Sequence, residues 1–254
     1  MTIEPPPIPW LEPGQPFPPF CDAWGENSPA PGLLCAGSDL KVDTLKQAYS
    51  SGIFPWYGEG QPILWWCPEP RMVLDVQNFR IHPSLKKAIK QFMRSQRCEI
   101  RMDFAFDEVM RACSASPRVG QSGTWILPEM MDAYSNLHRA GFAHSVETWI
   151  DGHLAGGLYG VSIGRAVFGE SMFHNVSNAS KIALAALVAF CRQHKISQID
   201  CQQNTRHLAS LGAGEVSRSE FVNRVKILTP APAIDWQFVP VYWNNLVAST
   251  GPNT

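Results

Sequence analysis

The pattern of hydrophobic and polar positions divides the chain into an irregular first third and a regular remainder. Ten of the 21 prolines lie in the first 31 residues, where fixed φ angles and missing N–H donors disfavour both helix and sheet. We therefore expect an extended, proline-rich arm over residues 1–32. Residues 33–79 hold one short helical pattern, Asp43 to Tyr49 with Asp43 as its N-cap, and then a stretch dense in Trp, Pro and Gly. We expect a small irregular domain or a lid there.

From residue 80 onward the periodicity is regular. The spacing predicts helices beginning at proline or ending at glycine, and one intervening strand: a helix from Pro83, a strand around Glu99 to Phe104, a helix around Phe106 to Cys113, and a helix from Pro128 to Gly141. The segment between the last two, "SASPRVGQSGTW", is a polar, glycine-bearing loop.

Alternating segments follow, and they predict an antiparallel meander of three strands. The strands are "HSVETWI", "HLAGGLYGV" and "RAVFGESMF", with turns at Asp151-Gly152 and at Ser162 to Gly164. A helix over about 177–194 then leads to the strand "SQIDCQ", and a capping box of Ser217 and Glu220 opens a last helix. Helices packed on a central sheet, in a mixed α+β domain over residues 80–245, are the expected architecture. Residues 246–254 are expected to form a flexible tail.

Composition excludes several classes of protein. The chain of 254 residues is 45% hydrophobic and 17% charged, which is too apolar for a disordered protein. Its net charge of -1 excludes a histone-like binder, so any nucleic-acid contact must come from a local patch. The longest apolar run, Ile182 to Cys191, is ten residues, about half of what crosses a bilayer. We expect no membrane association.

Cysteine usage and the first residues predict a cytoplasmic protein. The seven cysteines are scattered and include no CxxC pair, so neither a disulfide framework nor a metal site is expected. The first basic residue is Lys41, and a secretory signal needs a basic start. Walker A, GxGxxG and HExxH motifs are also missing, so we expect no cofactor.

One motif suggests a serine hydrolase. Gly160 to Gly164 reads GxSxG around Ser162, and Asp200 and His207 follow in the order of hydrolase triads. That motif requires a turn from a strand into a helix, whereas Ser162 is expected between two strands. A hairpin turn whose glycines adopt positive φ is the competing interpretation.

A basic stripe marks the helix that begins at Pro83. At 100° per residue Lys86, Lys90, Arg94 and Arg97 share one face, with Lys87 at its edge, and no acidic residue interrupts them. Such a face suits a nucleic-acid backbone, although a solvated helix face has the same pattern. Three tryptophans on polar segments, Trp56, Trp66 and Trp125, are candidates either for base stacking or for an irregular core.

Two carboxylates stand among hydrophobic residues. Glu170 lies in "FGESMF", and Asp200 ends an apolar strand in "IDCQ". A carboxylate in such a setting is costly unless it is paired, so each is either a site residue or an acid satisfied by neighbouring backbone.

Taken together, these segments resemble one family, the bacterial leucyl/phenylalanyl-tRNA-protein transferases. The resemblance rests on "GIFPWYGEGQPILWWCPEPR", "GTWI", "AHSVETW", "GGLYGV", "GESMF" with "NASKIAL", and "IDCQ" with "HLASLGAGEVSR". It implies a small N-terminal domain joined to a domain of GNAT-like acyltransferase fold. It also implies transfer of Leu or Phe from aminoacyl-tRNA to an N-terminal Lys or Arg of an acceptor protein, which marks that protein for N-end rule degradation.

The resemblance also implies roles for individual residues. Trp56 and Trp125 would hold the 3′-terminal adenosine, Asp200 and Gln202 would carry out the chemistry, and Glu170 would bind the acceptor. An apolar pocket for the Leu or Phe side chain would be lined by Leu158, Met172, Leu184, Leu187 and Ile199. The chain departs from the family pattern at His174 and Asn175, and at Leu158 and Leu187 in the pocket. The resemblance therefore does not fix whether the pocket prefers Leu or Phe.

The expected reaction needs neither a nucleophilic serine nor a cofactor, because the tRNA ester is already activated. Asp200, oriented by Gln202, would accept a hydrogen bond or the proton from the attacking amine, and a route through the ribose hydroxyl is the alternative. A GxSxG hydrolase and a tRNA-binding module without activity are the competing functions.

Overall fold

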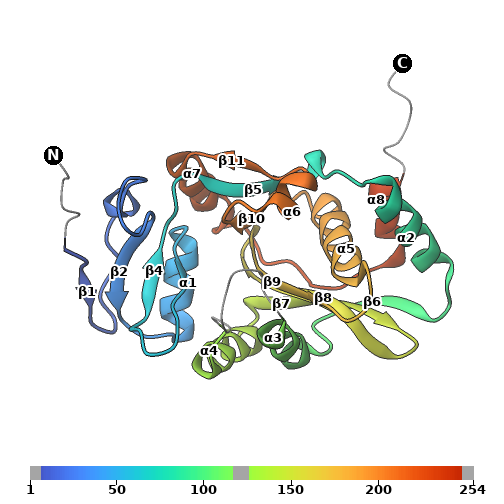
Figure 1. Cartoon of the computed structure of the whole chain (residues 1–254), viewed down its shortest axis with the longest axis horizontal. Coiled ribbons are helices and arrows are strands. Elements are labelled where there is room, and N and C mark those ends of the chain that lie inside the picture. Colours follow the sequence, from blue (N-terminus) through green and yellow to red (C-terminus); the bar gives the residue numbers. More distant parts are fainter. Residues whose placement is uncertain (1–6, 117–125, 248–254) are drawn as a thin grey trace, which may run out of the picture.

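The computed structural model describes residues 7–116 and 126–247, and these form two β-sheets with helices around them (Figure 1). The smaller sheet has the strand order β1-β2-β4-β3, and its strands are β1 (Trp10–Leu11), β2 (Leu33–Gly37), β3 (Phe54–Pro55) and β4 (Leu64–Trp66). Helix α1 (Val42–Ser50) and the short η1 (Phe20–Asp22) accompany it.

The larger sheet has seven strands in the order β11-β5-β10-β9-β8-β7-β6. Its strands are β5 (Arg71–Asp75), β6 (Cys98–Met102), β7 (Ala143–Ile150), β8 (His153–Ile163), β9 (Ala166–His174), β10 (Gln198–Gln202) and β11 (Gly214–Val216). Every neighbouring pair is antiparallel except β9 and β10, which run parallel. The mixed α and β architecture and the mostly antiparallel sheet are thus confirmed.

The meander β7-β8-β9 forms the centre of this sheet, as its alternation predicts. Asp151 and Gly152 have φ angles of 53° and 75°, which is the positive-φ pair that a tight hairpin requires. The second turn is shorter than expected. Ser162 belongs to strand β8, and the turn consists of Gly164 and Arg165.

Helix α5 (Ala179–Gln193) connects β9 to β10 across one face of the sheet. It is buried on nearly every side because α2 (Pro83–Arg94), η2 (Val76–Asn78), η3 (Pro240–Trp243) and α8 (Asn244–Val247) pack over it. The apolar run Ile182 to Cys191 is therefore a core helix, as its length predicts. No helix in the described ranges 7–116 and 126–247 has the length and hydrophobicity of a membrane span.

The opposite face of the sheet carries α3 (Phe106–Ala115) and α4 (Pro128–Arg139). These helices share one hydrophobic core with the smaller sheet and α1, and Tyr49 of α1 lies against Phe168 of β9 with ring centroids 5.1 Å apart. The proline-rich arm also contributes, since Leu11 and Ala23 are buried and β1 pairs with β2. The arm is therefore partly packed, because its short pairing strand falls between the prolines.

Several elements differ from the expected ones. Strand β5 lies before residue 80 yet pairs in the larger sheet, and α6 (Arg206–Ser210) and β11 separate β10 from α7 (Arg218–Leu228). The N-cap of α1 is Lys41, and Asp43 lies within its first turn. Ser217 caps α7 as predicted by accepting from the Glu220 N–H. The division of the chain into domains at the expected residues stays a prediction.

Candidate functional site

A cavity of about 350 Å³ opens between the smaller sheet and the central strands of the larger one. The smaller sheet contributes Phe54 and Trp56, and α5, β8, β9, β10 and α6 supply the remaining walls. Ten of the residues singled out from the sequence line it: Trp56, Leu158, Glu170, Met172, Leu184, Leu187, Ile199, Asp200, Gln202 and His207. The structure thus brings these residues together, while the role of each stays a prediction. Trp125 lies outside the described residues.

Glu170 is placed in the cavity by a β-bulge. Tyr159 pairs with Ser171 and Gly160 pairs with Gly169, so Glu170 is the extra residue of β9. A bulge interrupts the alternation of a strand and redirects one side chain. The redirected carboxylate accepts hydrogen bonds from the Tyr49 hydroxyl at 2.7 Å and from Gln202 Nε2 at 2.9 Å.

Burial raises the pKa of Glu170 from 4.5 to about 7, and the hydrogen bonds from Tyr49 and Gln202 only partly oppose this shift. A carboxylate in this state changes its charge near neutral pH. Such a group is common where a protein binds a cation or moves a proton.

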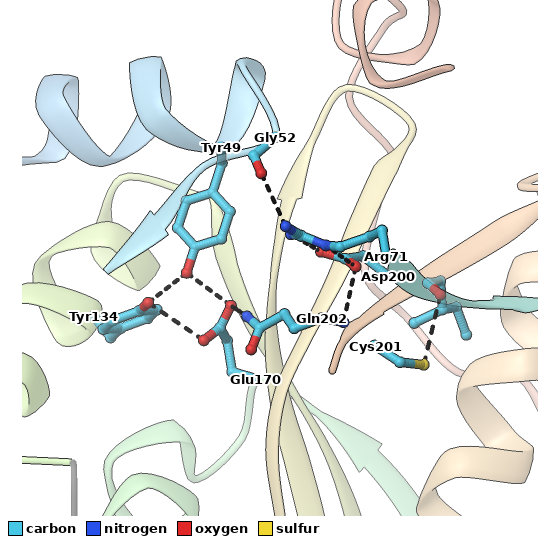
Figure 2. A network of polar contacts seen from close by, with 9 residues as sticks. Tyr49, Gly52, Arg71, Tyr134, Glu170, Asp200, Cys201 and Gln202 are labelled. Carbon is cyan, nitrogen blue, oxygen red and sulfur yellow. Dashed lines mark hydrogen bonds and ion pairs between the residues drawn. The ribbon is translucent and has the colours of Figure 1, made fainter. Parts of the chain in front are cut away.

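Two tyrosines complete the surroundings of Glu170, and the sequence did not single out either of them (Figure 2). Tyr49 comes from α1 and Tyr134 from α4; their hydroxyls are hydrogen-bonded to each other, and the Tyr134 hydroxyl lies 3.4 Å from Glu170 Oε2. Burial raises the pKa of both phenols well above the ordinary value, and the negative charge of Glu170 adds to this. They therefore stay protonated and act as donors. Their positions look like core positions of amphipathic helices, so periodicity gives no sign of this role.

Asp200 is clamped by Arg71 of β5. The guanidinium donates from Nε to Oδ1 at 2.8 Å and from Nη2 to Oδ2 at 2.5 Å, and both side chains are buried. Arg71 also donates to the Gly52 carbonyl at 3.1 Å and lies against the rings of Phe54 and Phe221. A bidentate, buried pair of this kind holds its carboxylate in one orientation. Sequence reasoning missed Arg71, which ends a Pro-rich segment.

Gln202 follows Asp200 across a second bulge. Asp200 pairs with Val73 and Gln202 with the adjacent Met72, so Cys201 is the extra residue of β10. Gln202 has a φ of 61°, which is unusual for a residue other than glycine. Its backbone N–H donates to Asp200 Oδ1 at 2.9 Å, while its side-chain Nε2 reaches Glu170. It is thus the backbone amide of Gln202 that holds Asp200, while the side-chain amide reaches Glu170.

The cavity has an apolar side as well as a polar side. Leu158 and Met172 are paired across β8 and β9, and Leu184 and Leu187 of α5 face them. Ile199 of β10 completes this side. A surface of aliphatic groups beside a carboxylate and an amide suits a ligand that is apolar at one end and polar at the other.

The basic stripe lies away from this cavity. Lys87, Lys90 and Arg94 are exposed on α2, while Lys86 is half-buried. Arg97 lies beyond the end of the helix at Arg94 and forms an ion pair with Asp151 at 3.0 Å, so its assignment to the helix face is wrong. No residue of α2 lines the cavity.

The structure excludes the serine-hydrolase interpretation of the GxSxG motif around Ser162. Ser162 is buried within β8, and β8 continues through a hairpin into β9 instead of a helix. Asp200 is held by Arg71, and His207 lies on α6 at the cavity. A GxSxG serine must be presented on a sharp strand-to-helix turn, and this chain has none at that position. Within residues 7–116 and 126–247 no group of three His, Cys, Asp or Glu side chains is arranged for a metal ion.

Comparison with known proteins gives one consistent result. The profile of the family "Leucyl/phenylalanyl-tRNA protein transferase" matches residues 73–226, and the profile of its N-terminal domain matches residues 38–69. A leucyl/phenylalanyl-tRNA–protein transferase from Albidiferax ferrireducens is 60% identical over 254 residues and covers 100% of both chains. Those from Polaromonas sp. and Burkholderia pseudomallei are 58% and 57% identical and cover 98% and 91% of this chain, and 97% and 91% of their own.

Proposed function

This chain belongs to the leucyl/phenylalanyl-tRNA–protein transferase family, and on that basis we propose that it moves Leu or Phe from its tRNA to the N-terminal Lys or Arg of an acceptor protein. The choice of these amino acids is supported by the two-sided cavity, in which an aliphatic surface adjoins a buried carboxylate. The chain is an aminoacyl-tRNA–protein transferase, and the choice of Leu, Phe, Lys and Arg is the proposal.

The aliphatic side supports a Leu or Phe donor. Burying a side chain of that size stabilises the bound state by about 1.5–3 kcal/mol, and the wall formed by Leu158, Met172 and Leu187 contains no charged group. Trp56 lies at the same cavity, half-buried, with its ring 5.4 Å from that of Trp66. A ring held in this way offers a face on which the terminal adenine of the donor stacks.

The carboxylate supports a cationic acceptor. Glu170 accepts from Tyr49 and Gln202 and can accept further hydrogen bonds at its second oxygen. A bound Lys or Arg side chain would stabilise its charged form and lower the pKa of Glu170 from about 7. We assign Glu170 to the first side chain of the acceptor.

In the reaction, the acceptor amine attacks the ester carbon, the new amide bond forms, and the bond to the ribose oxygen breaks. The amine needs only about 1 kcal/mol to be neutral at pH 7, since its pKa is about 7.7–8.0. Holding the amine against the ester supplies roughly 7–11 kcal/mol. Orientation is therefore the main contribution asked of the protein, and the proton of the amine ends on the departing ribose oxygen.

Asp200 was considered either as the acceptor of the amine proton or as a group that orients the amine, and this geometry supports orientation. Its carboxylate is buried, takes two bonds from Arg71, and holds the backbone of Gln202. The Gln202 Nε2 is used by Glu170, which leaves its Oε1 to accept a hydrogen bond from the attacking amine. We propose that Gln202 meets the amine and that Asp200 and Arg71 act through it as positioning residues.

Two further proposals, on the fold and on the cellular location, rest on the same family membership. The β9-α5-β10 unit gives the one parallel pair of an otherwise antiparallel sheet, and it supports the GNAT-like fold that the family resemblance implies. We place the reaction in the cytoplasm because aminoacyl-tRNA is made and used there.

The decisive experiment is transfer of radiolabelled Phe from Phe-tRNA to a peptide. We expect label on a peptide that begins with Arg and none on the same peptide with an acetylated N-terminus. A protein that binds Phe-tRNA but labels no peptide would be a tRNA-binding module. Release of free Phe with no labelled peptide would indicate a hydrolase.

A further inference from the structure

One histidine that lines the cavity, His207, and two basic residues near it, His174 and Lys181, have no role in the function proposed above. His207 of α6 lines the cavity. Lys181 lies in the first turn of α5, and His174 is the last residue of β9. We call His174, Lys181 and His207 the basic rim.

Strand and helix geometry place the rim beside the aliphatic wall. His174 follows Met172 by two residues and so faces the same side of the sheet. His174 is paired with Gly156, where an added Cβ would lie 2.6 Å from the Cβ of Ala179. The His174 side chain is therefore next to the first turn of α5, since paired side chains are about 5 Å apart.

Lys181 belongs to that same turn. It precedes Leu184 by three residues, and residues with this spacing are neighbours on a helix surface. Leu184 lines the cavity, so Lys181 extends the same helix face toward its opening. His207 closes the group: burial lowers its pKa, and the positive charges of Lys181 and His174 lower it further. His207 lines the same cavity as Met172 and Leu184, which are the neighbours of His174 and Lys181, so the three groups lie around one part of the cavity.

The rim has no anionic partner in the described part of the chain. None of the ion pairs there includes His174, Lys181 or His207. The two acids of the cavity are held elsewhere, Asp200 by Arg71 and Glu170 by Tyr49 and Gln202. The N-terminal end of α5 adds positive character at the same place, since its N-cap Asn178 makes no side-chain cap. Together these groups form a surface suited to one anion.

We propose that the basic rim binds the phosphate that joins the 3′-terminal adenosine of the donor tRNA to the preceding nucleotide. This inference rests on the proposed function, which places the terminal adenosine and its ester in the cavity. The two substrates differ in charge at this point. The acceptor brings a cationic residue, which the rim repels, whereas the donor brings a phosphate directly attached to the adenosine. Lys181 supplies the charge, and the imidazoles donate N–H groups.

The test uses two unreactive donor analogues that differ in one group. Both are 3′-phenylalanylamido adenosine, one with a 5′-phosphate and one without, and binding is measured by calorimetry at low salt. Charge-assisted hydrogen bonds to a phosphate are expected to give the phosphorylated analogue at least about tenfold higher affinity for the unaltered protein. The Lys181→Gln/His207→Gln variant should lose this advantage and keep its affinity for the analogue without phosphate.

A matched control is Lys41→Gln/His153→Gln, which replaces one Lys and one His that are exposed and do not line the cavity. It should preserve the full advantage of the phosphate. The single variant His174→Gln, at an exposed strand end, gives a second reading with little risk to folding and should lose part of that advantage.

Three results would overturn the inference. An unaltered protein that binds both analogues equally has no phosphate subsite, although the proposed function survives. If the rim variant loses affinity for both analogues to the same extent, the rim residues maintain the structure of the cavity and do not bind a phosphate. An unaltered protein that binds neither analogue contradicts the donor assignment itself, and the rim assignment with it.

Discussion

Glu170→Gln should change the pH dependence of stability in a direction fixed by the burial of this carboxyl. In the unfolded chain the pKa of Glu170 is about 4.5, and in the folded protein burial raises it to about 7. Between these values the folded state binds more protons than the unfolded state. The stabilisation from the protonated carboxyl is therefore complete below about pH 4.5 and is lost as pH rises through about 7.

The size of the effect follows from the same two pKa values. At about 1.4 kcal/mol for each pH unit, the free energy of unfolding of the unaltered protein should fall by at most about 3.5 kcal/mol from this one group. The side-chain amide introduced by Glu170→Gln cannot ionise, so the variant escapes the loss. The replacement keeps an oxygen that can accept from Tyr49, and any hydrogen bond it does lose gives an offset that does not depend on pH.

Urea unfolding at pH 5, 6, 7 and 8 measures this difference. The free energy of unfolding of Glu170→Gln, relative to the unaltered protein, should rise across the series and level off near pH 8. The control Glu59→Gln removes an exposed carboxylate outside the cavity and should run parallel to the unaltered protein. A constant difference between Glu170→Gln and the unaltered protein over the whole series would refute the reasoning.

Three further outcomes are expected. Arg71→Met should lower the free energy of unfolding, measured in urea, by about 3–5 kcal/mol because it leaves a buried carboxylate without its partner. The double variant Arg71→Met/Asp200→Leu should regain most of this free energy. Additive effects of the two substitutions would contradict a direct interaction between Arg71 and Asp200. Lys86→Gln/Lys90→Gln should raise the KM for aminoacyl-tRNA and flatten its salt dependence by about two phosphate contacts, with no change for an aminoacyl-adenosine donor; an equal effect on both donors would exclude a tRNA-binding face. Ser162→Ala should keep Phe transfer within about twofold, because Ser162 is buried in a strand, and loss of transfer would revive the hydrolase reading.

The sequence predicts the parts of this fold that depend on repeating side-chain patterns. The helices that begin at Pro83 and Pro128 start where proline suits a first helical position, and both begin there in the structure. The hairpin at Asp151-Gly152 and the core helix α5 follow equally from local residues. The aliphatic side of the cavity was expected from the family resemblance, and the residues named for it do line the cavity.

The polar side of the cavity was not predictable in the same way. Two bulges, at Glu170 and at Cys201, change which face a side chain takes, and alternation alone gives no sign of an extra residue. Arg71 follows a Pro-rich segment and belongs to a strand that only its distant partners reveal. Tyr49 has the spacing of a core residue. Its hydroxyl becomes part of the polar side of the cavity only because the bulge in β9 places Glu170 within hydrogen-bond distance of it.

The polar contacts around the cavity join segments that are far apart in the sequence. Arg71 and Asp200 are 129 residues apart, and Tyr49 and Glu170 are 121 residues apart. During synthesis α1 and the smaller sheet emerge first, before the strands that carry Glu170 and Asp200 have been translated. The walls of the cavity are complete only when α6 has been translated. An unfinished chain therefore has no assembled site with which to draw on the aminoacyl-tRNA supply of the ribosome that is making it.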